Sequence, residues 1–224
     1  MSRFFHVQEI AKPEDVIPFL AKRERHWKQG YSAYELAHSW VNAGDIPGPV
    51  RSVLDTCADY TGVTLVEGLF ERAVDLRTPG RRSQTDLLVF VNSVHGNAVI
   101  AVEGKVDEPF DDLVSTWNDG SPRKVRRLTA LCASLGLSVA DVDRIRYQLL
   151  HRTASTIYEA QRYRVTRAVM LVHSFSATEA SFPDFQAFSR SMGIPVEAVN
   201  CVSEERDCEG IRLRLAWVKD RPSM

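Results

Sequence analysis

Two neighbouring segments are apolar at their centres on both faces, and they constrain the fold more than any other feature. Residues 85–92 (TDLLVFVN) and 98–106 (AVIAVEGKV) are rich in β-forming residues, and a tight turn at His95-Gly96 separates them. Successive side chains of a strand point to opposite faces of a sheet, so both faces of these two strands must be covered. The sequence therefore predicts a sheet that lies inside the protein between layers of helices.

The rest of the chain supplies such layers. Further strands are expected over residues 63–76, 167–173, 196–202 and 210–218. Helices are expected over residues 13–27, 32–44, 49–60, 109–117, 122–135, 142–163 and 182–192. This order predicts a single α/β domain over residues 1–224 with a mixed sheet. Its expected parts are an N-terminal helical elaboration (1–47), a core (48–175), and a C-terminal helix and strands that complete the sheet (176–224).

Composition and charge narrow the function. The chain has 224 residues, of which 44% are hydrophobic, and its 28 basic and 29 acidic residues nearly balance. This balance excludes a protein that coats nucleic acid by bulk charge, but it permits a local basic groove. No segment approaches the roughly 18 apolar residues of a membrane helix, and the N-terminus lacks a signal-peptide pattern. We therefore expect a cytoplasmic protein without membrane contact.

Charged residues stand at the ends of the two apolar strands. The second strand ends in Glu103-Gly104-Lys105, and Asp86 opens the first. Glu103 and Lys105 share a face because they are two residues apart. A two-residue turn at His95-Gly96 would place Asp86 opposite Lys105, about 5 Å away between Cβ atoms, with Glu103 diagonal at roughly 7–8 Å. A three-residue loop would scatter the three charges.

Two carboxylates that meet at this point predict a cation site. They would repel each other unless a cation lay between them. Oxygen ligands of this kind suit Mg²⁺, or Mn²⁺ in its place, and Lys105 could then orient a water or offset charge on a phosphate. The alternative is a plain cross-strand ion pair between Asp86 and Lys105.

Asp86, the hairpin and Glu103-Gly104-Lys105 resemble the motif of the PD-(D/E)XK nuclease superfamily. The order of elements from residue 49 to residue 173 is similar to the α-β-β-β-α-β core of that superfamily, which has a restriction-endonuclease-like fold. Thr85 stands where the motif often has proline. The resemblance implies that Asp86 and Glu103 bind Mg²⁺, that Lys105 is catalytic, and that the substrate is DNA.

The resemblance also implies further site residues. An acid from a helix ahead of the sheet often joins the site, and Glu35 is preferred over Asp55 and Asp59, although Ser32-x-x-Glu35 also fits a capping box. Glu67 and Glu71 on the first strand are weaker alternatives.

Polar side chains from the helix after the third strand are expected at the site as well. Gln148 and Arg152 are the candidates, on a face that continues through Ser155 and Glu159, with His151 as a less favoured base. Arg81, Arg82 and Arg152 would contact the nucleic acid.

Three functions remain open on the sequence. The preferred one is a Mg²⁺-dependent DNA nuclease, which could act as a homodimer. The second is a catalytically inactive module of the same fold that binds nucleic acid or a protein partner. The third is a metal-dependent phosphohydrolase that acts on a small substrate.

Overall fold

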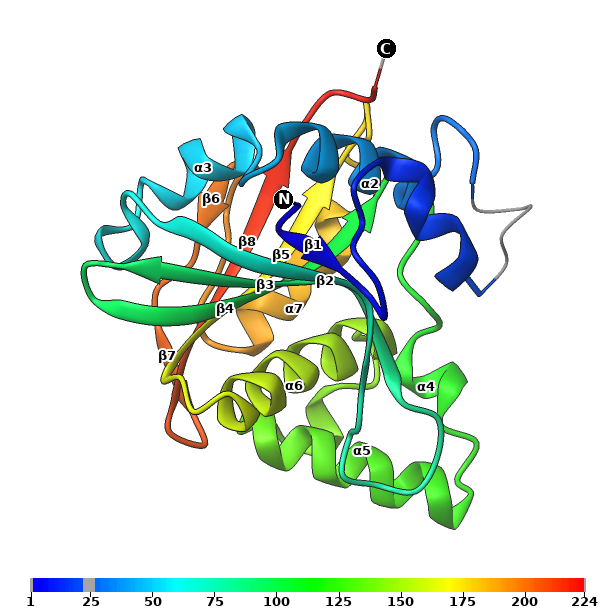
Figure 1. Ribbon diagram of the computed structural model, residues 1–224. Helices are drawn as coiled ribbons and strands as arrows, with labels where there is room; N and C mark the ends of the chain where they lie inside the picture. Colours follow the sequence, from blue (N-terminus) through cyan, green and yellow to red (C-terminus); the bar gives the residue numbers. More distant parts are fainter. Residues whose placement is uncertain (1, 22–26, 224) are drawn as a thin grey trace.

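The computed structural model describes residues 2–21 and 27–223, and in them a mixed eight-stranded sheet is flanked by helices, so the predicted α/β class is confirmed (Figure 1). The strand order across the sheet is β1-β2-β3-β4-β5-β8-β6, and β7 pairs with β8. β2, β3 and β4 form an antiparallel meander, whereas β4, β5 and β8 run parallel. The strands span Phe4–Phe5 (β1), Thr64–Val74 (β2), Ser83–Ser93 (β3), Gly96–Lys105 (β4), Arg167–Ser174 (β5), Cys201–Val202 (β6), Arg206–Cys208 (β7) and Ile211–Lys219 (β8).

Helices cover both faces of the sheet, as the apolar strands predict. α2 and α3 lie on one face and α5, α6 and α7 on the other (Figure 1). Leu87 packs into the core beneath α2 and α3, and its neighbour Leu88 packs into the core beneath α6. The helices are Ser32–Ala43 (α2), Gly48–Leu54 (α3), Val114–Trp117 (α4), Pro122–Leu135 (α5), Tyr147–Arg162 (α6) and Phe182–Ser191 (α7), with 3₁₀ turns at Pro13–Phe19 (η1), Ala58–Tyr60 (η2) and Val139–Asp141 (η3).

Several expected elements differ in extent. The helix expected from residue 13 is a 3₁₀ helix that ends at Phe19, and Pro18 within it has no amide hydrogen to donate to an α-helical ladder. Residues 22–26 of that expectation lie outside the described residues. α6 begins at Tyr147 rather than at residue 142, because extended Arg146 pairs with Leu113 instead.

The ends of the sheet also differ from expectation. The strand expected over residues 196–202 is reduced to β6, and the expected charged turn contains the short β7. β1 was not expected, and it pairs in parallel with Gly68 and Leu69 of β2. β1 has only two residues, so its sequence shows almost none of the alternation that predicts a strand.

The turn between β3 and β4 lies one residue earlier than the sequence predicts. Ser93 pairs with Gly96, so the two turn residues are Val94 and His95. The hydroxyl of Ser93 fixes this turn, because it accepts the His95 amide at 3.1 Å and donates to the Gly96 carbonyl at 3.2 Å. The pairing therefore slips by two residues, which preserves the face of every side chain.

This register brings Asp86 beside Glu103, and not opposite Lys105 as predicted. Leu87 pairs with Val102, so the next residues of the two strands are Asp86 and Glu103. The backbone amide of Gly104 donates to Oδ2 of Asp86 at 3.0 Å, which holds the carboxylate against β4.

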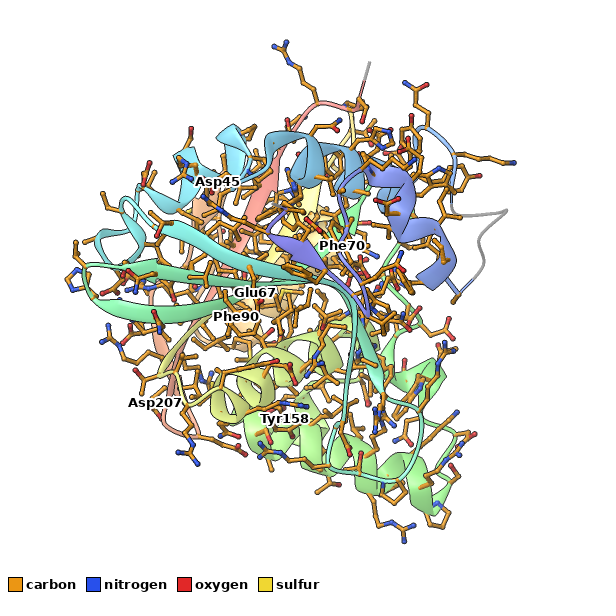
Figure 2. All side chains as sticks on the ribbon, in the orientation of Figure 1. Asp45, Glu67, Phe70, Phe90, Tyr158 and Asp207 are labelled. Carbon is orange, nitrogen blue, oxygen red and sulfur yellow. The ribbon has the colours of Figure 1, made fainter. Side chains whose placement is uncertain are left out.

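The β2–β3 hairpin bends next to Asp86. Phe70 pairs with Leu87 and packs beneath α2 (Figure 2). Arg72, two residues on, instead bonds Glu159 of α6 at 2.9 Å. Between them Glu71 has a positive φ of 50°, a left-handed conformation that costs a residue with a side chain of the order of 1–3 kcal/mol. The hairpin thus leaves the plane of the sheet at Glu71 and continues over α6, with Asp86 at the bend.

No helix in the described part of the chain is long and apolar enough to cross a membrane.

Candidate functional site

An open pocket of about 810 Å³ lies where β3 and β4 end against α6. Its walls come from the β2–β3 loop, the start of α5, the first half of α6 and the segment around Ser32. Most of the predicted site residues line it: Asp86, Glu103, Lys105, Gln148, Arg152, Arg81 and Arg82. The hairpin register places Asp86 beside Glu103, and the helical spacing of α6 places Gln148 and Arg152 on the face toward them.

Glu103 is the most heavily bonded of these residues. Its side chain is only 4% exposed. Oε2 accepts from Nε of Arg152 at 2.5 Å, and Oε1 accepts from Nε2 of Gln148 at 2.6 Å and lies 3.3 Å from Nζ of Lys105. Burial alone would raise the pKa of Glu103, but Arg152 and Lys105 hold it below its ordinary value. Glu103 is therefore ionised at neutral pH.

Asp86 is less well compensated. Its side chain is 24% exposed, and Oδ1 lies 3.5 Å from Nη2 of Arg152. Burial and the nearby charge of Glu103 raise the pKa of Asp86 to about 7. Asp86 is therefore partly protonated near neutral pH, chiefly because burial disfavours the charged form.

A third carboxylate, Glu71, stands in the same row on β2. Oε2 accepts from Nε2 of Gln84 at 2.6 Å. Burial, followed by the charge of Asp86, raises the pKa of Glu71 to about 8. Sequence reasoning ranked Glu71 behind Glu35. The signal that favours it is the antiparallel pairing of the first two strands, which places it next to Asp86.

Lys105 is buried behind Glu103. Its Nζ donates to Oε1 of Gln148 at 3.1 Å and lies 4.6 Å from the centre of the Phe110 ring. Gln148 therefore acts as a bridge, since its amide group donates to Glu103 while its carbonyl oxygen accepts from Lys105. This bridge fixes the relative positions of a carboxylate and an ammonium group.

Arg152 connects the strands to α6. Its guanidinium group reaches Glu103 and Asp86, as given above, and Nη1 donates to Oγ of Ser83 at 3.2 Å. Oγ of Ser83 also lies 2.9 Å from Nδ1 of His151. The bent end of the hairpin is thus tied to α6 by two consecutive helix residues.

His151 lies between Ser83 and Asp111. Nε2 of His151 is 3.9 Å from Oδ2 of Asp111, whose side chain is 67% exposed. Burial lowers the pKa of His151 to about 4, so the ring is neutral at pH 7. The contact of His151 with the exposed Asp111 is long, whereas its contact with Ser83 is short and Ser83 is only 3% exposed. His151 therefore anchors the hairpin to α6.

Basic side chains border the mouth of the pocket. Arg81, Arg82 and Arg123 are exposed, and Lys124 is half-buried. Nη2 of buried Arg127 donates to the carbonyl of Arg81 at 2.5 Å, which fixes the β2–β3 loop against α5. The rim thus presents fixed positive charge beside the acidic row.

The structure does not bring Glu35 into the pocket. It is fully buried under the opposite face of the sheet, where its carboxylate accepts from the amide of Gly30 at 2.7 Å and from the amide and hydroxyl of Ser223 at 2.6 Å. The predicted capping box is also wrong, because α2 is preceded by Tyr31 and not by Ser32. Three hydrogen-bond donors surround this buried position, and the carboxylate of Glu35 satisfies all three.

The other acidic candidates also lie away from the pocket. Asp55 accepts from the amide of Gly62 at 2.8 Å, and Asp59 forms ion pairs with the β8 residues Arg212 and Arg214. Glu67 pairs with Phe90 farther along the sheet (Figure 2).

Asp86 and Glu103 are the residues that could hold a metal. As the side chains stand, no group of three His, Cys, Asp or Glu residues within the described ranges is arranged to bind one. Two carboxylates on adjacent strands nevertheless suit Mg²⁺, which commonly takes one or two carboxylates and keeps several waters.

A family model described as a domain of unknown function (DUF6946) matches residues 9–222. No curated protein and no solved structure matches the chain.

Proposed function

This chain belongs to the DUF6946 family, and we propose that it is a Mg²⁺-dependent nuclease with a restriction-endonuclease-like core that hydrolyses phosphodiester bonds of DNA. The observation that carries the proposal is the arrangement of Asp86, Glu103 and Lys105 in one pocket. The two acids lie at corresponding positions of adjacent strands, and Lys105 follows Glu103 on the same face. This arrangement supports the proposal, because the PD-(D/E)XK motif combines two metal-binding acids and a lysine on neighbouring strands.

Each residue has a chemical role in this proposal. Asp86 and Glu103 would hold the metal, with Mn²⁺ able to replace Mg²⁺. The bound ion would polarise a phosphate oxygen and lower the pKa of a water. Lys105, fixed by Gln148 and Glu103, would orient that water or offset charge on the phosphate. Gln148 is a positioning residue, because it acts through its bonds to the other two.

The basic rim would bind the substrate. Arg81 and Arg82 are exposed on a loop that Arg127 holds in place. Contacts of this kind to phosphate oxygens position a nucleic acid without reading its sequence.

Plasmid nicking in the presence of Mn²⁺ tests the proposal. The wild-type protein should nick DNA, and Asp86→Asn and Lys105→Ala should each abolish nicking. Glu67→Gln is the matched control, since it removes an acid of β2 outside the pocket and should leave nicking unchanged. Equal nicking by Lys105→Ala and wild type would refute the assignment of this site.

Two observations favour other functions. Arg152 already bridges Asp86 and Glu103, which suits an inactive module that binds nucleic acid or a protein partner through the same pocket. The pocket volume also lies within the range of small-ligand sites, which suits a phosphohydrolase acting on a small substrate. A steep loss of DNA affinity with salt would favour either DNA-binding function over the small-substrate one.

A further inference from the structure

The inference concerns Arg152 and rests on the proposed function. We propose that Arg152 occupies the ligand carboxylates in the metal-free protein and exchanges them for a substrate phosphate when a divalent cation binds, so that cation and phosphate bind cooperatively.

The oxygens of the two ligand residues are already engaged by protein donors. Arg152 contacts one oxygen of each residue, Glu103 Oε2 at 2.5 Å and Asp86 Oδ1 at 3.5 Å. The other oxygen of Glu103 accepts from Gln148, and the other oxygen of Asp86 accepts from the amide of Gly104. A cation bound by both carboxylates would therefore compete with Arg152 for their lone pairs and repel its charge.

Arg152, and not Lys105, is the cation free to exchange. Lys105 is held by Gln148 and by the ring of Phe110 as well as by Glu103, so it keeps partners if Glu103 is taken. Among the described residues, the side chain of Arg152 contacts Glu103, Asp86 and Ser83, and Arg152 lines the pocket. Ser83 would remain satisfied without it, through its contact with His151.

Charge determines where the released guanidinium group goes. Asp86 and Glu103 both contact Arg152, and Glu71 stands beside them, so in the metal-free protein the guanidinium group is committed to acids and not to a phosphate. A divalent cation adds positive charge beside these acids and competes with Arg152 for them. A phosphodiester in the pocket then offers Arg152 the oxygen pair that arginine binds well.

Calorimetric titration of Mg²⁺ into the full chain, with and without saturating inorganic phosphate, tests the proposal. Arg152→Gln should bind Mg²⁺ about tenfold more tightly than wild type, because the competing cation is gone, and a coupling of this size is usual between linked sites. Phosphate should tighten Mg²⁺ binding to wild type several-fold but not to Arg152→Gln. Arg162→Gln is the matched control, since it removes an exposed arginine of the same helix outside the pocket, and it should bind Mg²⁺ and respond to phosphate as wild type does.

Arg152→Lys provides a second variant if the glutamine variant does not fold. It keeps the charge but loses the planar fork of five N–H donors and should hold the two carboxylates less firmly, so its affinity for Mg²⁺ should exceed that of wild type and its response to phosphate should be smaller. Equal Mg²⁺ affinity in wild type and the Arg152 variants, with no effect of phosphate, would overturn the inference and leave the proposed nuclease intact. Absence of Mg²⁺ binding in every protein would overturn the proposed function and the inference together.

Discussion

Replacement of Asp86 by asparagine should stabilise the metal-free protein at neutral and higher pH. Asp86 lies in a row of three carboxylates, and burial followed by the charge of Glu103 raises its pKa to about 7 from an ordinary value of 3.8. Asparagine has the same shape, and its oxygen can still accept the amide of Gly104. The substitution therefore removes an ionisation that the fold opposes while it retains the main hydrogen bond.

The expected size follows from the same pKa values. A rise from 3.8 to about 7 corresponds to about 4 kcal/mol if the carboxyl is fully ionised. The side chain is 24% exposed, and water that reaches it reduces the gain to about 1–3 kcal/mol. In a chain of this length, each kcal/mol raises the Tm by about 2–4 °C.

The sign of the pH dependence is fixed by the raised pKa. The stability contributed by protonated Asp86 is fully present below pH 3.8 and is lost as the pH rises through about 7. The advantage of Asp86→Asn should therefore grow as the pH rises across this window. Thermal unfolding with a chelator at about pH 5 and about pH 8 measures it. An asparagine variant that is less stable than wild type at the higher pH, or a difference that does not change with pH, would refute the reasoning.

Three further predictions concern residues outside the pocket. Gly68→Ala should cost about 1–3 kcal/mol in urea unfolding, because a Cβ would lie 2.6 Å from the ring of Phe4. Burial lowers the pKa of His173 below its ordinary value of 6.5. The stability that neutral His173 contributes is therefore present above pH 6.5 and is lost as the pH falls through the lowered pKa. His173→Asn should flatten this part of the pH–stability curve. Glu35→Gln should lower the free energy of unfolding by about 1–3 kcal/mol but leave Mn²⁺-dependent nicking intact, whereas loss of nicking in a folded variant would restore the catalytic role predicted for Glu35.

The sequence could predict the layers of this fold because their patterns are local. The continuous apolar runs of the central strands and the helical spacing in α5 and α6 depend only on neighbouring residues. The common face of Glu103 and Lys105 follows from the way successive side chains of a strand point to opposite faces. Gln148 and Arg152 follow from their i, i+4 spacing on a helix that packs against the sheet.

The remaining features depend on contacts between distant residues. The pairing of β3 with β4 slipped by two residues because Ser93 fixes the turn, and nothing in the apolar pattern distinguishes the two registers. The bend at Glu71 requires a positive φ at a non-glycine residue, which the packing of the hairpin on α6 imposes. Glu35 was preferred over Glu71 because position ahead of the sheet is visible in a sequence, whereas burial under the opposite face is not.

The most direct test of the central claim is the anomalous diffraction of crystals soaked in Mn²⁺. The account predicts a peak bonded to the carboxylates of both Asp86 and Glu103, with Arg152 displaced from at least one of them. A structure in which Mn²⁺ binds elsewhere, or not at all, while Arg152 still bridges the two acids would contradict the claim that this pocket is a metal-dependent catalytic site.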